Sequence, residues 1–155
     1  MTITSWRVVS ERYATTAFNG EGAKLYPGRW NKRGTPMVYT GQTLSLAVLE
    51  LLVHLDGPSI LPEYVAIPIS FEESQCLRLP ESHLPSNWAI HPPPPSTREI
   101  GTSWVQELSS LVLLVPSFLV PTEGIYLINP LHFDARSMKA GKPIKFMMDS
   151  RLIKK

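Results

Sequence analysis

Proline is the residue type that most constrains how this chain folds. Fifteen of the 155 residues are proline, about twice the share usual in globular proteins. Proline lacks a backbone N–H and has a fixed φ, so it interrupts helices and central strands. Residues 92–95 are four consecutive prolines, which predict an extended, polyproline-like segment. We therefore expect short elements joined by fixed turns.

Two helices are expected. In residues 44–55, leucine, alanine and valine recur with the 3.6-residue period of a helix, and Thr43 is a suitable N-cap. Apolar residues lie nearly all round this helix, so we expect it to be buried, and Asp56-Gly57-Pro58 is expected to end it. A second helix is predicted over residues 96–108, opened by a capping box of Ser96 and Glu99.

Strands account for most of the remaining pattern. Alternating or short apolar runs predict strands at residues 3–9, 37–40, 63–70, 75–79, 111–115, 117–120, 125–128 and 143–148. Residues 10–30 contain several glycines and are expected to be irregular. Strands first and last with helices between them favour an α+β fold. The length favours a single compact domain over residues 1–155.

Composition narrows the functional classes. The net charge is +2 with no long basic run, so direct nucleic-acid binding is not expected. The single cysteine, Cys76, permits no internal disulfide and fits a reducing compartment, and the scattered histidines predict no metal site. No signal-peptide pattern is seen, and the longest apolar run is too short to span a bilayer. A cytoplasmic protein without membrane contact is expected.

Glu50 is the sharpest candidate for chemistry. A carboxylate on a buried helix costs several kcal/mol unless it is paired or hydrogen-bonded. It precedes His54 by four residues, so the two share a helix face. Glu50 therefore either pairs with His54 or reaches water, or it lines a cavity and stabilises positive charge there.

Arg29, Tyr39 and Arg7 are further candidates. Arg29 follows Gly28 in a turn that suits bidentate phosphate recognition but that is equally consistent with a structural corner. Tyr39 is either a packed strand aromatic or a ring that stacks on a planar ligand. Arg7 alternates with the apolar Trp6, so it faces either solvent or a pocket.

Ser117 allows one further arrangement. Ser117, His132 and Asp134 are the residue types of a Ser-His-Asp hydrolase triad. No Gly-x-Ser-x-Gly turn surrounds the serine, however. The sequence also lacks a dinucleotide-binding glycine motif and a P-loop. These observations disfavour a serine hydrolase and a nucleotide site of the Rossmann or P-loop kind.

The order of these candidates resembles the RES domain family, named for an arginine, a glutamate and a serine. The matching segments are Trp6-Arg7-Val8, Gly28-Arg29-Trp30-Asn31, Val38-Tyr39-Thr40, Ala47-Val48-Leu49-Glu50, Val53-His54, Val115-Pro116-Ser117, Leu127-Ile128-Asn129-Pro130, His132 and Asp149-Ser150-Arg151-Leu152. They span nearly the whole chain, and their order and spacing are jointly specific.

The resemblance implies a bacterial toxin with a fold like that of ADP-ribosyltransferase toxins. Such toxins degrade NAD⁺ at the nicotinamide–ribose bond, and their partner is an antitoxin with an Xre-type helix-turn-helix domain. It implies NAD⁺ as substrate and no prosthetic group. The catalytic residues would be Glu50, Arg29 and Tyr39, and Arg7, Arg29, Tyr39, Ser117 and Asn129 would contact NAD⁺. A protein ADP-ribosyltransferase and an inactive antitoxin-binding domain remain as alternatives.

Overall fold

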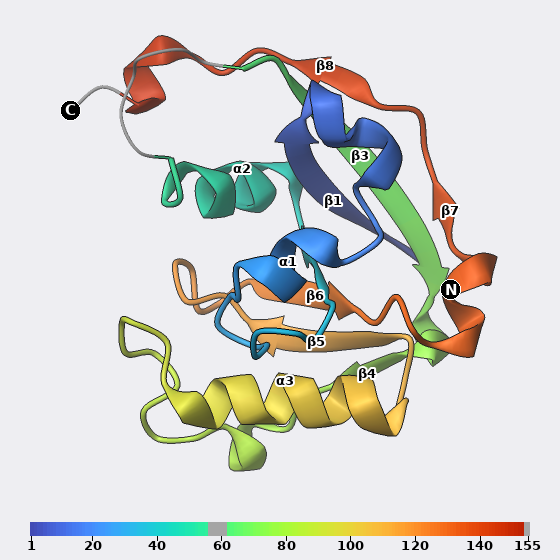
Figure 1. Ribbon diagram of the computed structural model, residues 1–155, viewed down its shortest axis with the longest axis vertical. Helices are drawn as coiled ribbons and strands as arrows, with labels where there is room; N and C mark the ends of the chain where they lie inside the picture. The colour runs from blue at the N-terminus through green and yellow to red at the C-terminus, as the bar shows by residue number, and fades with distance from the viewer. Residues whose placement is uncertain (56–61, 154–155) are drawn as a thin grey trace.

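One continuous, curled sheet organises the chain (Figure 1). The computed structural model describes residues 1–55 and 62–153. The main path of the sheet runs β4-β5-β6-β2-β1-β3-β7, and β8 also pairs with β3. The strands are β1 (Thr2–Ser10), β2 (Val38–Gly41), β3 (Tyr64–Glu72), β4 (Cys76–Arg78), β5 (Val112–Pro116), β6 (Gly124–Ile128), β7 (Lys139–Ala140) and β8 (Ile144–Phe146).

The helices are few and short. They are α1 (Glu21–Leu25), α2 (Leu44–Leu52) and α3 (Pro95–Glu107), with 3₁₀ helices η1 (Glu11–Thr16), η2 (Glu73–Gln75), η3 (Glu81–His83), η4 (Phe133–Ser137) and η5 (Ser150–Ile153). This strand-rich architecture confirms the predicted α+β class. Within the described ranges, no helix is long and apolar enough to cross a membrane.

The sheet divides into two halves where β1 meets β2. β1 pairs with β3 along its whole length, but its register with β2 consists of one pair, Trp6 with Gly41. Figure 1 shows β1, β3, β7 and β8 in the upper half of the view and β4, β5 and β6 in the lower half. Because side chains alternate along a strand, Trp6 and Tyr39 point to one face and Arg7 to the other.

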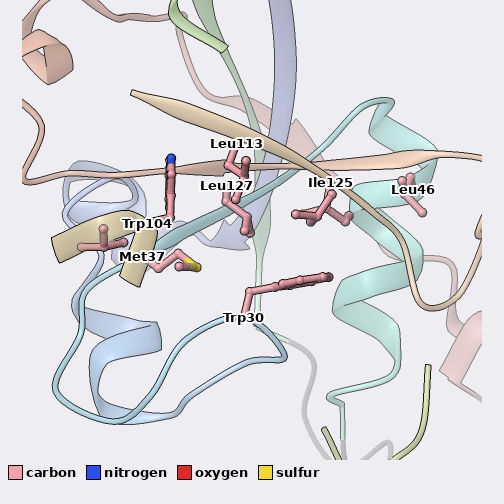
Figure 2. Packing of buried hydrophobic residues seen from close by; sticks show 9 residues of the cluster. Trp30, Met37, Leu46, Trp104, Leu113, Ile125 and Leu127 are labelled. Carbon is pink, nitrogen blue, oxygen red and sulfur yellow. The ribbon is translucent and has the colours of Figure 1, made fainter. Parts of the chain in front are cut away.

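The main core lies on the Tyr39 face of the lower half. Trp30 packs there with Trp104 of α3, Leu46 of α2, and Ile125 and Leu127 of β6, all at most 6% exposed. Figure 2 shows the Trp30 ring lying below Ile125 and Leu127, with Leu46 beyond them. The indole therefore joins the loop before β2 to the sheet and both longer helices.

Helix α2 begins where the sequence predicts, but it ends earlier than predicted. Thr43 caps it, accepting a hydrogen bond from the Leu46 N–H at 3.1 Å. The helix ends at Leu52 rather than at residue 55, and the predicted terminator at residues 56–58 lies outside the described residues. Its burial is also one-sided, because Leu49 is 43% and Val53 57% exposed. The prediction of an all-round buried helix is therefore wrong.

The predicted capping box of α3 is also wrong. Pro94 occupies the N-cap and Pro95 the first helical position, where a missing N–H costs nothing. The Ser96 hydroxyl instead donates a hydrogen bond to the Asn87 side-chain oxygen at 2.8 Å. The serine thus ties the loop before α3 to the helix.

Most predicted strands correspond to observed strands within two residues at either end, as is usual for boundaries. Residues 117–120 are an exception, because the N–H groups of Leu119 and Val120 turn back to the Ser117 hydroxyl. Such serine-capped turns compete with extended structure. Residues 10–30 also contain η1 and α1, so that segment is not wholly irregular.

Candidate active site

Glu50 and Ser117 meet although 67 residues separate them. Glu50 lies on α2 and is half-buried, and Ser117 follows β5 and is fully buried. The Ser117 hydroxyl donates a hydrogen bond to Glu50 Oε1 at 2.8 Å. Of the hydrogen bonds between described residues, this one alone reaches the carboxylate, and it uses Oε1.

The turn after β5 fixes the Ser117 hydroxyl. Its oxygen accepts hydrogen bonds from the N–H groups of Leu119 and Val120, each at 3.1 Å. The Ser117 N–H donates to the Glu123 carbonyl at 2.9 Å, which closes the base of the turn. Since two donors occupy the oxygen, the hydroxyl proton is directed at Glu50. This serine orients the carboxylate.

Arg29 is held on one edge by backbone carbonyls. Its Nη1 donates to the Trp88 carbonyl at 2.9 Å and to the Ile90 carbonyl at 2.6 Å. The guanidinium carbon lies 4.1 Å from the centre of the Phe118 ring, within the range of a cation–π contact. Since Phe118 follows Ser117, the turn that orients Glu50 also supports Arg29.

Tyr39 fixes the turn that carries Arg29. Its hydroxyl donates to Asn31 Oδ1 at 2.6 Å and accepts from the Trp30 N–H at 3.0 Å. A Cβ placed on Gly28 would lie 2.7 Å from the Tyr39 ring, so the absent side chain makes room for the tyrosine. Burial raises the pKa of Tyr39, and the phenol stays protonated at neutral pH.

The Asn31 side chain completes this turn. Its Oδ1 also accepts the Gly28 N–H at 2.9 Å, and its Nδ2 donates to the carbonyls of Ala23 and Thr35 at 2.8 and 3.1 Å. The side chain is fully buried. Removing this side chain would leave several buried polar groups without a hydrogen-bond partner. A buried network whose polar groups are satisfied in this way holds the Arg29 turn rigidly.

Charges of both signs meet around Arg29. Partial burial lowers the pKa of Arg29, the nearby Glu50 carboxylate opposes that shift, and the Arg98 guanidinium adds to it. Arg98 comes from α3 and donates from Nε to the Gly28 carbonyl at 3.1 Å. The site therefore combines one carboxylate with two guanidinium groups.

Arg7 lies apart from this group. Its Nη1 donates to the Tyr39 carbonyl at 3.1 Å, but its side chain is on the sheet face opposite the Tyr39 ring. Burial lowers the pKa of Arg7 to about 10. Its buried Nε has no hydrogen-bond partner among the described residues. Arg7 thus closes the gap between β1 and β2, and its predicted contact with NAD⁺ stays a prediction.

Asn129 is also separate from the site. Its Nδ2 donates to the Val105 carbonyl and its Oδ1 accepts the Leu131 N–H, both at 3.0 Å. The side chain is fully buried. These contacts tie the end of β6 to α3. The Asn129 side chain is therefore not exposed to solvent in this structure, and its predicted contact with NAD⁺ stays a prediction.

Two of the alternatives left open by the sequence can be compared with this geometry. His54 is exposed, and Glu50 is paired with Ser117 instead. β5 and β6 form an antiparallel pair with Pro116 opposite Gly124 and Val112 opposite Ile128. Ser117 and His132 consequently lie at opposite ends of that pair, which excludes a Ser-His-Asp triad.

The comparison with known families decides the assignment. A family model described as the RES domain matches residues 4–149. The chain belongs to the RES domain family. A Toxin Res of Yersinia enterocolitica is 41% identical over 148 residues, which cover 95% of this chain and 97% of the relative. A Toxin Res of Photorhabdus laumondii is 39% identical and covers 96% of each chain.

Two further matches extend this picture. A protein of a Sphingobium species named Prs ADP-ribosylating toxin is 36% identical and covers 100% of this RES domain and 99% of its own length. The crystal structure of the M. tuberculosis MbcT–MbcA toxin–antitoxin complex contains a chain with a TM-score of 0.71 at 16% identity. That match covers 94% of this chain and 85% of the other, and it shows a shared fold. The recognition as a RES family toxin is confirmed.

Sequence reasoning missed two residues of this site, Arg98 and Phe118. Arg98 lies in a helix flanked by polar residues, where an arginine is normally solvated. Phe118 was assigned to a strand that does not form. The available signal was the position of Phe118 directly after the family's serine.

Two surface cavities lie away from this group. One, of about 360 Å³, is lined by residues of the β4 region, the end of α3 and the start of η4, among them Leu77, Leu108 and Phe133. The other, of about 260 Å³, lies beside Glu72 and Lys139. Neither cavity is lined by Glu50 or Arg29.

Proposed function

We propose that this RES domain is an NAD⁺-degrading toxin that releases nicotinamide. The observation that carries the proposal is the Ser117–Glu50 hydrogen bond beside Arg29. It leaves one oriented carboxylate with a free oxygen next to a cation anchored on carbonyls and an aromatic ring. A dinucleotide with a positively charged pyridinium and a negatively charged pyrophosphate complements this charge pattern.

Cleavage of the nicotinamide–ribose bond develops positive charge on the ribose, as in glycoside hydrolysis. A fixed carboxylate stabilises that oxocarbenium-like state because its position needs no rearrangement during the reaction. Glu50 would perform this role, and its Oε2 would accept a hydrogen bond from a ribose hydroxyl. Nicotinamide leaves as a neutral ring with the bonding electron pair, so no general acid is required.

The remaining residues would bind or position the substrate. Arg29 would contact the pyrophosphate through its N–H groups that face away from the carbonyls. Tyr39 would offer its ring to the nicotinamide, because its hydroxyl already belongs to the turn. Ser117 would act by holding Glu50 rather than by binding NAD⁺.

Incubation of the purified protein with NAD⁺ tests this proposal. We expect release of nicotinamide together with ADP-ribose in plain buffer, or ADP-ribose 1″-phosphate when inorganic phosphate is the acceptor. Comparing products with and without phosphate distinguishes the two reactions. Absence of nicotinamide release by the antitoxin-free protein would contradict the proposal.

A second candidate is transfer of ADP-ribose to a protein. The Sphingobium relative, which is named an ADP-ribosylating toxin, favours it. The bond that breaks is the same, and the acceptor differs. Labelled NAD⁺ would then mark a protein target in a bacterial lysate, whereas a glycohydrolase or phosphorylase leaves the label on small molecules.

An antitoxin is the proposed partner. The matched fold comes from a toxin–antitoxin complex, and the family resemblance implies an Xre-type helix-turn-helix protein. We expect cytoplasmic expression of the toxin alone to arrest the growth of the bacterial cells. Co-expression of the antitoxin should relieve the arrest. Normal growth without the antitoxin would favour a catalytically inactive binding domain.

A further inference from the structure

Arg98 contacts the site and has no ionic partner among the residues that the structure describes. Its Nε is held by the Gly28 carbonyl, beside Arg29. Among the ion pairs of the described residues, none includes Arg98, whereas its neighbour Glu99 pairs with Lys32. The half-buried guanidinium therefore adds a second positive charge at the Arg29 turn, where Glu50 is the carboxylate near Arg29.

Helix α3 is packed closely on this turn, which fixes where Arg98 lies. The Thr97 hydroxyl donates to the Arg29 carbonyl at 2.7 Å, and the Thr102 hydroxyl accepts the Lys32 N–H at 2.9 Å. Arg98 follows Thr97 directly. Both arginines are thus anchored to the same turn, Arg29 by its backbone and Arg98 by its side chain.

The charge of Arg98 lowers the pKa of Arg29, so the two guanidinium groups repel each other, and an anion bound by both would relieve that repulsion. Each has one edge hydrogen-bonded to carbonyls, which orients its remaining N–H groups. Arg7, which the family resemblance also places in contact with NAD⁺, lies on the other face of the sheet. Arg98, by contrast, contacts the turn that carries Arg29.

We propose that Arg98 is a second ligand-binding residue and forms, with Arg29, a subsite for the pyrophosphate of a dinucleotide. This inference rests on the proposed function for the identity of the dinucleotide. A pyrophosphate carries two negative charges, so two guanidinium groups balance it. A charge-assisted hydrogen bond of this kind contributes a factor of roughly 10 to 100 in affinity.

Arg98→Gln in the full chain tests the inference. We expect its KM for NAD⁺ to rise about 10- to 100-fold while kcat changes little, because Glu50 is untouched. Inhibition by nicotinamide, which has no phosphate, should be unchanged. Arg98→Lys should recover part of the loss because it keeps the charge. Arg136→Gln, which removes an exposed arginine on η4, is the control and should behave as wild type.

The outcomes separate a ligand contact from a structural brace. An unchanged KM for NAD⁺ would overturn the inference, as would an equal loss of affinity for NAD⁺ and nicotinamide. If the wild type does not cleave NAD⁺ at all, the proposed function fails, and calorimetric titration with ADP still tests the subsite. Arg98→Gln should then bind ADP about 10- to 100-fold more weakly. Equal binding by both proteins, or none by the wild type, would contradict it.

Discussion

At the scale of single residues, the site depends on how two polar side chains share their hydrogen bonds. The Ser117 oxygen accepts hydrogen bonds from two backbone N–H groups. Its hydroxyl therefore donates its own hydrogen bond to Glu50. A carboxylate fixed in this way stabilises developing charge without reorganising. In the proposed mechanism, Ser117 therefore acts by positioning Glu50.

Ser117→Ala should therefore slow the reaction and weaken the fold. It leaves the buried N–H groups of the turn without an acceptor, which costs about 1–3 kcal/mol of unfolding free energy. We expect kcat to fall roughly 10- to 100-fold, since one positioning hydrogen bond is lost. Steady-state kinetics and thermal denaturation measure the two effects. The exposed Ser82→Ala is the control. Full activity of Ser117→Ala would show that Glu50 needs no positioning.

Cys76 should react slowly. Burial raises the pKa of its thiol from an ordinary value near 9 to about 11. At pH 8 the thiolate fraction is then about 100-fold lower than for an exposed cysteine. Alkylation by iodoacetamide at pH 8 should be slower by that factor than for a cysteine peptide, and should accelerate as the pH rises toward 11. Equal rates at pH 8 would contradict the raised pKa.

The individual candidate residues could be predicted from the sequence. Which residues lie beside them in the site could not. Glu50 is conspicuous in the sequence because a carboxylate stands among apolar residues, and Arg29 because it follows a glycine in a turn. Nothing local shows that Arg98 reaches the same turn or that Arg7 points away from it. Those facts depend on which strand pairs with which and on the path of α3.

At the scale of elements, the contact between α3 and the Arg29 turn decides the geometry of the site. Gly101 makes this contact possible, because a Cβ there would lie 1.7 Å from the Trp30 carbonyl oxygen. The atom that would clash is backbone, so it cannot move aside as a side chain end does. The glycine is required for close approach and not for an unusual φ.

Gly101→Ala should consequently destabilise the protein although alanine is the better helix former. Helix propensity alone favours alanine over glycine by about 1 kcal/mol. We expect the clash to exceed this gain and to lower the unfolding free energy by about 2–4 kcal/mol, comparable to overpacking of a core. Gly22→Ala in α1, which meets no atom within 4 Å, is the control. A higher melting temperature for Gly101→Ala would refute the close packing.

Elements with a clear period were predictable from the sequence. The alternation in residues 63–70 and the helical period after Thr43 both gave the right element. The strand predicted at residues 117–120 is wrong because a serine side chain can accept hydrogen bonds from backbone N–H groups and replace strand pairing. The capping box predicted at Ser96 is wrong because two prolines already begin the helix. Short β7 carries no pattern long enough to detect.

At the scale of the whole molecule, the chain builds a sheet in two halves joined at one residue pair, Trp6 with Gly41. Glu50 follows β2 and Ser117 follows β5, so the site lies where distant parts of the chain converge. Strand order is set by long-range pairing, which local patterns do not encode. Only the resemblance to a family pointed to this fold in advance.

The central claim is that Glu50 is the carboxylate at the bond that breaks, and nicotinamide release by Glu50→Gln measures it most directly. Glutamine keeps the size of the side chain and can still accept the Ser117 hydrogen bond, but it carries no charge. We predict a rate at least 10²-fold below wild type, with an unchanged circular dichroism spectrum. Glu107→Gln, on the exposed end of α3, should cleave NAD⁺ normally. Wild-type turnover by folded Glu50→Gln would contradict the account.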